Sequence, residues 1–256
     1  MTHRKSLAHG LAAAAIPFAL LAVPAAIPAQ EQASFSEASL YFELNDSDGD
    51  LGIHGSIDGD EWRRLTIEDP NERVILNTNV LGRLARQGLT QFFFESAEPR
   101  FDELAPADFF KRFPEGTYEI EGRALDGTEL ENEVEISHIM AAPAGNIRIN
   151  GVAAAVNCSA LPLPVVSAPV RVEWNEVTTS HPTIGTPGEP VTVEEYQVFL
   201  ELRGSDVKMS ENLPPGTTSM DVPLDFTARG NRFKLEVLVR ADNGNQTATE
   251  TCFELL

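Results

Sequence analysis

The chain carries short runs of alternating apolar and polar residues, separated by Asp, Gly, Asn and Pro, and almost no helical periodicity after residue 30. Alternation places every second side chain on one face of a strand, which is typical of antiparallel sandwiches and barrels. The one helix that we predict is Pro106–Arg112, because proline suits the first helical position and phenylalanines follow it. The pattern therefore predicts an all-β chain. The expected strands are Ser39–Asn45, Leu51–Ile57, Glu61–Ile67, Arg73–Val80, Leu89–Glu95, Thr117–Leu125, Glu129–Ser137, Val170–Thr178, Val193–Leu202, Ser219–Val222, Arg232–Arg240 and Thr247–Phe253.

Residues 1–29 have the features of a secretory signal peptide. Arg4 and Lys5 supply a positive start, Leu7–Val23 is uncharged and rich in Ala and Leu, and small residues precede Gln30. An uncleaved membrane anchor is the alternative, although prolines at 17, 24 and 28 interrupt the stretch. We expect cleavage after Ala29, a periplasmic or extracellular location, and no transmembrane segment in the mature chain.

The composition limits the partners and divides the chain. With 19 basic and 39 acidic residues the formal charge is -20, which argues against nucleic acid or an anionic membrane as a partner. The length of 256 residues fits one large domain or two ordinary ones. Charge almost disappears between Ala141 and Pro169, where Ala, Pro, Gly and Val dominate. We therefore predict a β-rich domain of unassigned family at 36–141, a linker at 142–160 and a second domain at 161–256.

Four segments of the second half carry a family resemblance. Val170–Trp174 alternates apolar residues before a tryptophan, and Tyr196–Val198 has the Tyr-x-Val pattern of a central strand. Leu213–Thr218 contains a Pro-Gly-Thr turn, and Leu235–Gly244 ends in Ala-x-Asn-Gly before a further strand. Residues 161–256 thus resemble a fibronectin type III domain. The resemblance implies an immunoglobulin-like sandwich that serves as a spacer or a protein-binding module.

Two features depart from that family. Leu235 stands where the late strand usually has the tyrosine of a tyrosine corner. The connection Thr179–Pro190 is longer than these domains usually show.

Cys158 and Cys252, the only two cysteines, lie near the two ends of the fibronectin-like segment. The first and last strands of such a domain are close together, and an exported chain meets oxidising conditions. We predict a disulfide that closes a loop of about 95 residues, and two unpaired buried thiols are the alternative.

The most pointed candidate site is the sequence Asn45-Asp46-Ser47-Asp48-Gly49-Asp50. Asp46, Asp48 and Asp50 have the one-three-five spacing by which short acidic loops collect oxygen ligands for calcium. Leu51 stands where an EF-hand has glycine, and Ile57 where it has glutamate. The alternative is that Asp48-Gly49 and Asp58-Gly59 are tips of hairpins whose carboxylates face water. Calcium is the one cofactor that the sequence suggests.

We find no catalytic constellation. His54, His138 and His181 are scattered, and the chain lacks a Gly-x-Ser-x-Gly elbow, a phosphate-binding glycine loop and a His-Glu-x-x-His motif. We therefore expect an exported, non-enzymatic binding, adhesion or structural module that contacts a protein or a glycan. The alternative is an accessory carbohydrate-binding module or hydrolase of the cell envelope that uses the acidic hairpins of the first domain.

Overall fold

The computed structural model describes Met1 and residues 32–256, so the predicted signal peptide lies outside the described residues apart from Met1. Residues 32–256 form one compact unit that is almost entirely β-structure. The predicted helix at Pro106–Arg112 is confirmed as α1. Among the described residues, no helix is long and apolar enough to cross a membrane.

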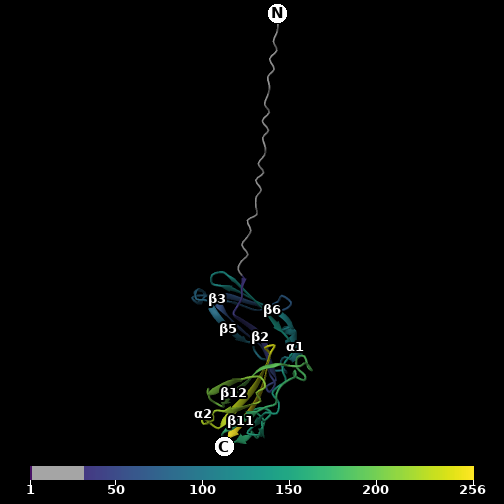
Figure 1. Cartoon of the computed structure of the whole chain (residues 1–256), viewed down its shortest axis with the longest axis vertical. Coiled ribbons are helices and arrows are strands. Elements are labelled where there is room, and N and C mark those ends of the chain that lie inside the picture. Colours follow the sequence, from purple (N-terminus) through teal and green to yellow (C-terminus); the bar gives the residue numbers. More distant parts are fainter. Residues whose placement is uncertain (2–31) are drawn as a thin grey trace. The chain divides into compact units, whose positions relative to one another are not determined.

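Strands β1 to β7 form a first sandwich (Figure 1). Strand β3 takes part in both of its sheets, because residues 50–58 pair with β2 and β5, and residues 62–68 pair with β4 and β6. Register shifts on either side of Trp62 mark the bend between the two parts. The two strands predicted at Leu51–Ile57 and Glu61–Ile67 are therefore one bent strand. The bounds are β1 Gln32–Ala33, β2 Glu37–Asn45, β3 Asp50–Glu68, β4 Val74–Asn79, β5 Leu89–Glu95, β6 Gly116–Ala124 and β7 Glu129–Ile136, with a 3-10 turn at Leu84–Arg86.

The first core follows from the alternation seen in the sequence. Leu40, Phe42 and Leu44 point inward from β2 and are at most 3% exposed, and they pack with the buried Trp62 and Tyr118. Tyr118 lies at the start of β6, and its hydroxyl donates to the carbonyl oxygen of Pro114 at 3.0 Å. A buried tyrosine that bonds to the backbone a few residues upstream is the arrangement of a tyrosine corner.

Strands β8 to β16 form a second sandwich. One sheet has the order β14-β11-β8-β9, and the other has β16-β15-β12-β13. Their inner faces meet over a core that includes Trp174, Tyr196 and Leu235. The bounds are β8 Arg148–Ile149, β9 Val152–Ala153, β10 Val165–Val166, β11 Val170–Glu173, β12 Val193–Leu202, β13 Lys208–Leu213, β14 Ser219–Val222, α2 Leu224–Thr227, β15 Arg232–Ala241 and β16 Gln246–Leu255.

The two sandwiches share one strand order. In the first, β2-β3-β5 faces β4-β3-β6-β7; in the second, β8-β11-β14 faces β13-β12-β15-β16. A short helix precedes the sixth strand in both, α1 before β6 and α2 before β15. Seven strands in two antiparallel sheets are the immunoglobulin-like sandwich, the class that includes fibronectin type III domains. The predicted fold class, two β-sandwich domains, is confirmed, and both sandwiches have this topology.

The segment predicted as a linker contributes to the second core. Strand β8 pairs with β11, and Ile147 and Ile149 are buried there. Part of the segment 142–160 therefore belongs to the second sandwich, which begins before residue 161.

Three groups of contacts join the sandwiches. Strand β16 pairs in parallel with β2, with Gln246 opposite Glu43. The side chain of Asn245 is 1% exposed; it accepts from the backbone N–H of Phe42 and donates to the carbonyl oxygens of Ser137 and Ile139. The long connection after β11 reaches the first sandwich, where Ile184 is part of the core.

Candidate functional site: an acidic face around a buried histidine

The site lies on the outer side of the sheet β2-β3-β5. Because the even-numbered residues of β2 point into the core, Tyr41 and Glu43 point outward. In the register of the sheet, His54 lies opposite Tyr41 on one side and opposite Glu95 on the other, and Gly52 lies opposite Glu43. Strand pairing thus places the imidazole of His54 between β2 and β5, which carry the acidic residues Glu43 and Glu95.

His54 is buried although it lies on an outer face, and it is only 3% exposed. The rings of Tyr41 and Phe93 lie 5.4 and 6.2 Å from the imidazole centroid. Its Nε2 is 3.0 Å from Oε1 of Glu98, and its Nδ1 is 3.6 Å from Oε2 of Glu43. Both ring nitrogens therefore face carboxylates.

Burial and neighbouring carboxylates together shift the pKa values of the groups on this face. Burial lowers the pKa of His54, but the hydrogen bond from its ring to the Glu98 carboxylate and the charge of Glu43 outweigh it and raise the pKa overall. Burial raises the pKa of Glu43, and the charges of Glu98 and Glu95 add to this. Burial, together with the charge of Glu98, raises the pKa of Asp50 to about 6. Several carboxyl groups on this face thus lie close enough together to affect one another's pKa values.

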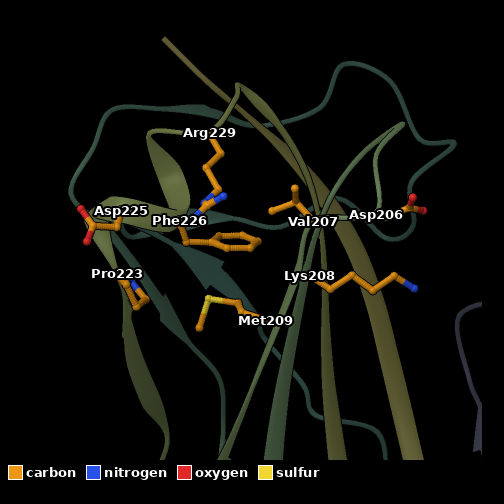
Figure 2. A pocket seen from close by; sticks show the side chains of 8 residues that line it. All are labelled: Asp206, Val207, Lys208, Met209, Pro223, Asp225, Phe226 and Arg229. Atoms are coloured by element: carbon orange, nitrogen blue, oxygen red, sulfur yellow. The ribbon is translucent and has the colours of Figure 1, made fainter.

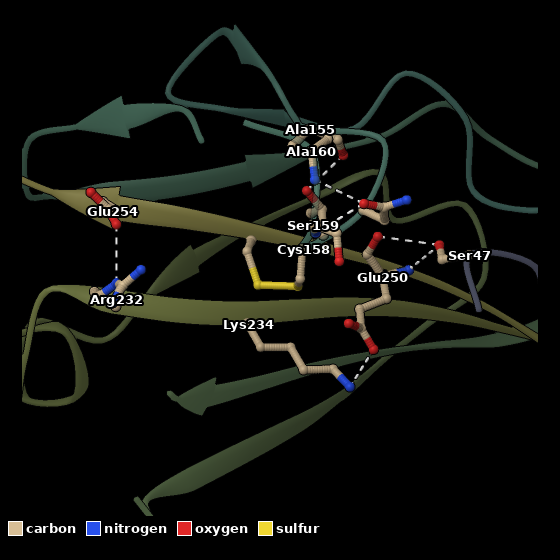
Figure 3. Close-up of a disulfide and its surroundings, with 12 residues drawn as sticks. Ser47, Ala155, Cys158, Ser159, Ala160, Arg232, Lys234, Glu250 and Glu254 are labelled. Carbon is tan, nitrogen blue, oxygen red and sulfur yellow. Dashed lines mark hydrogen bonds and ion pairs between the residues drawn. A yellow bond between two sulfur atoms is a disulfide. The ribbon is translucent and has the colours of Figure 1, made fainter. Parts of the chain in front are cut away.

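The acidic face continues onto the second sandwich through the pairing of β2 with β16. Glu236 on β15 lies opposite Glu250 on β16, and Glu250 forms an ion pair with Lys234 (Figure 3). The backbone N–H of Glu250 donates to Oγ of Ser47 in the first sandwich. Burial raises the pKa of Glu236 to about 7, although the charge of Lys234 lowers it. We call the outer side of β5, β3, β2, β16, β15 and β12 the acidic face.

The three aspartates predicted as calcium ligands are not brought together. Among residues 32–256, the group of three His, Cys, Asp or Glu ligand atoms that lie within 4.8 Å of one another consists of His54, Glu95 and Glu98. Oδ1 of Asp46 instead lies 2.9 Å from Nε2 of His181, and Asp48 is exposed. The side-chain oxygen of Asn45 accepts from the backbone of the turn, at 3.1 Å from both Ser47 N and Asp48 N.

Sequence reasoning missed the histidine cluster. Glu95 and Glu98 follow one another closely in the sequence, but His54 lies about 40 positions earlier. The only sequence signal was that His54 falls on the outward positions of an alternating strand. Finding its partners required the strand register, which the sequence does not encode locally.

The predicted disulfide between Cys158 and Cys252 is confirmed (Figure 3). The two Cα atoms are 4.7 Å apart, and the bridge ties the segment before β10 to the last strand. Such bonds persist in oxidising compartments, which agrees with an exported protein.

A second surface feature is a depression of about 470 Å³ between β13 and α2 (Figure 2). Its centre is apolar, with Phe226 and Met209, and charged side chains surround it. Lys208 and Arg229 lie on its rim with Asp225, so the charges are mixed. It offers no concentrated charge comparable to the acidic face.

No protein-family model and no curated protein matches the sequence. Among solved structures, the chain is similar to the FN1–FN3 domains of chicken CNTN1, with 8% identity and a TM-score of 0.35, covering 88% of this chain and 65% of the other. A bacterial ice-binding adhesin matches with 15% identity and a TM-score of 0.25, over 88% and 65% of the two chains. A two-domain fibronectin type III segment of chicken tenascin matches with 9% identity and a TM-score of 0.29, over 85% and 97%.

The chain spans 65% of the length of the first two of these structures. At such identities and TM-scores the fold is assigned by the strand order of each sandwich, which is that of a two-sheet, seven-strand domain. The resemblance to fibronectin type III domains is confirmed at the level of the fold.

Proposed function

We propose that the chain is an exported, non-enzymatic binding module that contacts a protein or a glycan at the cell envelope or outside the cell through its acidic face. The observation that carries this proposal is the pairing of β2 with β16, which joins the outer sides of two sandwiches into one continuous surface. A surface built on two joined domains presents more area to a partner than either domain alone.

The charges on this surface indicate the chemistry of the partner. Glu43, Glu236 and Glu250 lie on adjacent strands, and Arg240 and Lys234 only partly offset them. A negative surface attracts a partner with basic groups and speeds its association at low salt. Binding should therefore weaken as the ionic strength rises.

The experiment measures binding of the mature chain to envelope preparations and to a glycan array at several salt concentrations. The face variant carries Glu201→Gln and Glu236→Gln, on β12 and β15. The matched control carries Glu131→Gln and Glu133→Gln, which remove two charges from β7. We expect saturable binding that the face variant weakens at least about tenfold, a loss of about 1.4 kcal/mol, and that the control leaves unchanged.

Two results would count against the proposal. Equal binding by both variants would exclude the acidic face as the contact surface. Release of reducing ends from an envelope polysaccharide by the purified chain would support the hydrolase alternative.

A further inference from the structure

We propose that His54, Glu95 and Glu98 form a binding site for a divalent transition-metal ion, with Zn²⁺ as the best-fitting ion. This site does not depend on the proposed binding function. Its three ligand atoms lie within 4.8 Å of one another, and Nε2 of His54 is 3.0 Å from Oε1 of Glu98. Ligand atoms of a tetrahedral Zn²⁺ site lie about 3.3 Å apart, given metal–ligand distances of about 2.0–2.1 Å.

A third carboxylate, that of Glu43, contacts the other ring nitrogen of the histidine. Nδ1 of His54 faces Oε2 of Glu43 at 3.6 Å. A metal-binding histidine commonly donates its other ring N–H to a carboxylate, which fixes the orientation of the ring and makes the ligand more basic. The amide of Gln246 satisfies both of its polar atoms when its oxygen faces Arg240 and its nitrogen faces Glu43. In this orientation the nitrogen donates to the same Oε2 of Glu43 at 3.1 Å. Glu43 is thus itself held in position.

Gly52 provides an independent observation. A Cβ atom at this position would lie 2.8 Å from Cγ and 2.8 Å from Oε1 of Glu98, closer than side chains approach one another. The backbone of Gly52 has ordinary dihedral angles for a strand, so turn geometry does not explain the glycine. The missing side chain leaves the space through which the Glu98 carboxylate reaches His54.

The charge balance of the cluster also favours a cation. Three carboxyl groups, those of Glu43, Glu95 and Glu98, surround one imidazole, so acidic side chains outnumber the basic one in this cluster. Like charges at this separation repel, and the repulsion grows as water is excluded. The burial of His54 beneath Tyr41 and Phe93 excludes water on one side, whereas Glu95 is exposed on the other. An ion would therefore be held from the protein side and would keep an open position toward solvent.

The donor set selects the class of ion. Imidazole with two carboxylates suits Zn²⁺ and related first-row ions, whereas Ca²⁺ takes six to eight oxygen ligands. A calcium preference would instead indicate the aspartate loop at Asp46–Asp50.

The test titrates ZnCl2 and CaCl2 separately into the untagged mature chain after chelator treatment, by calorimetry and by thermal unfolding. The variants are Glu95→Gln and Glu98→Gln, and Asp48→Asn is the matched control that removes one carboxylate from the neighbouring turn. Glu95 is exposed, so its substitution leaves the fold intact, and circular dichroism checks this directly.

We expect one equivalent of Zn²⁺ to bind and to raise the melting temperature, because the ion binds the folded chain. Each glutamate variant should lose at least about tenfold in affinity, and Asp48→Asn should match the wild type. Co²⁺ should give the visible absorption of a low-coordinate site in the wild type and lose it in Glu95→Gln. Absence of stoichiometric Zn²⁺ binding would overturn the proposal and leave His54 as an ion-paired histidine. Binding that is lost in Asp48→Asn but kept in Glu95→Gln would place the ion in the turn and would equally overturn it.

Discussion

Replacement of Glu236 by glutamine should stabilise the protein at neutral and higher pH. Burial raises the pKa of this carboxyl from 4.5 to about 7, and the nearby Glu43 and Glu250 add to the effect. Below pH 4.5 the side chain is protonated in both the folded and the unfolded chain and adds no pH dependence. Between pH 4.5 and 7 the unfolded chain loses its proton first, so the free energy of unfolding falls as the pH rises, and the loss is complete above pH 7.

The size of the effect follows from the two pKa values. At about 1.4 kcal/mol per pH unit, the ionised Glu236 destabilises the folded chain by about 3 kcal/mol at pH 8. Glutamine keeps the shape of the side chain and removes its charge. The difference in the free energy of unfolding between the variant and the wild type should therefore grow by about 2–3 kcal/mol from pH 5 to pH 8. Urea unfolding at each pH measures this difference, with the exposed Glu194→Gln as the control. A gain that does not change with pH, or an equal gain in the control, would refute the reasoning.

Three further variants test the contacts that hold the chain together. Replacing Cys158 and Cys252 by alanine should lower the free energy of unfolding by about 2–5 kcal/mol, measured by urea unfolding with and without reductant, which should affect only the wild type. Ile184→Ala should cost about 2–4 kcal/mol, and proteolysis should then cut the 179–190 connection faster than in the wild type. Asn245→Ala leaves buried backbone groups of the first sandwich without partners, at about 1–3 kcal/mol for each group, and hydrogen exchange should show faster exchange of the Phe42 amide while β12 stays protected.

The sequence was sufficient for the class of fold and for most of the second sandwich. The alternation in Val193–Leu202 and Arg232–Ala241 directly reports which side chains face the core, because each strand has one buried and one solvent-facing side. The helix Pro106–Arg112 was predictable for the same local reason, since proline and a phenylalanine stripe mark its start and its buried side. The disulfide followed once the ends of one domain were taken to be neighbours.

The shared topology of the two halves was not predictable from the sequence. In the first sandwich, one uninterrupted strand, Asp50–Glu68, crosses from one sheet to the other, whereas in the second a long connection separates β11 from β12. The tyrosine corner is formed by Tyr118 in the first half, and Leu235 occupies the late strand in the second. Strand order depends on long-range pairing, and two sequences with different local features can satisfy the same pairing.

The candidate site could not be predicted from the sequence for a related reason. The spacing of Asp46, Asp48 and Asp50 is visible in the sequence, but a one-three-five pattern brings carboxylates together only when the backbone curls around an ion. Here the turn is closed by the side chain of Asn45, and Asp46 pairs with His181 from a segment 135 residues away. Partners at such separations are set by the tertiary structure.

Two connections join the two sandwiches, and one of them, the 179–190 connection, departs from the fibronectin pattern. The 179–190 connection is long because it carries Ile184 into the first core and His181 to Asp46. The hairpin after β15 places Asn245 against three backbone groups of the first half. An independent spacer domain would need neither feature, since each buries polar groups that must then be paired with the other half. These contacts hold β2 beside β16, and they are therefore the reason that the carboxylates of two domains share one face.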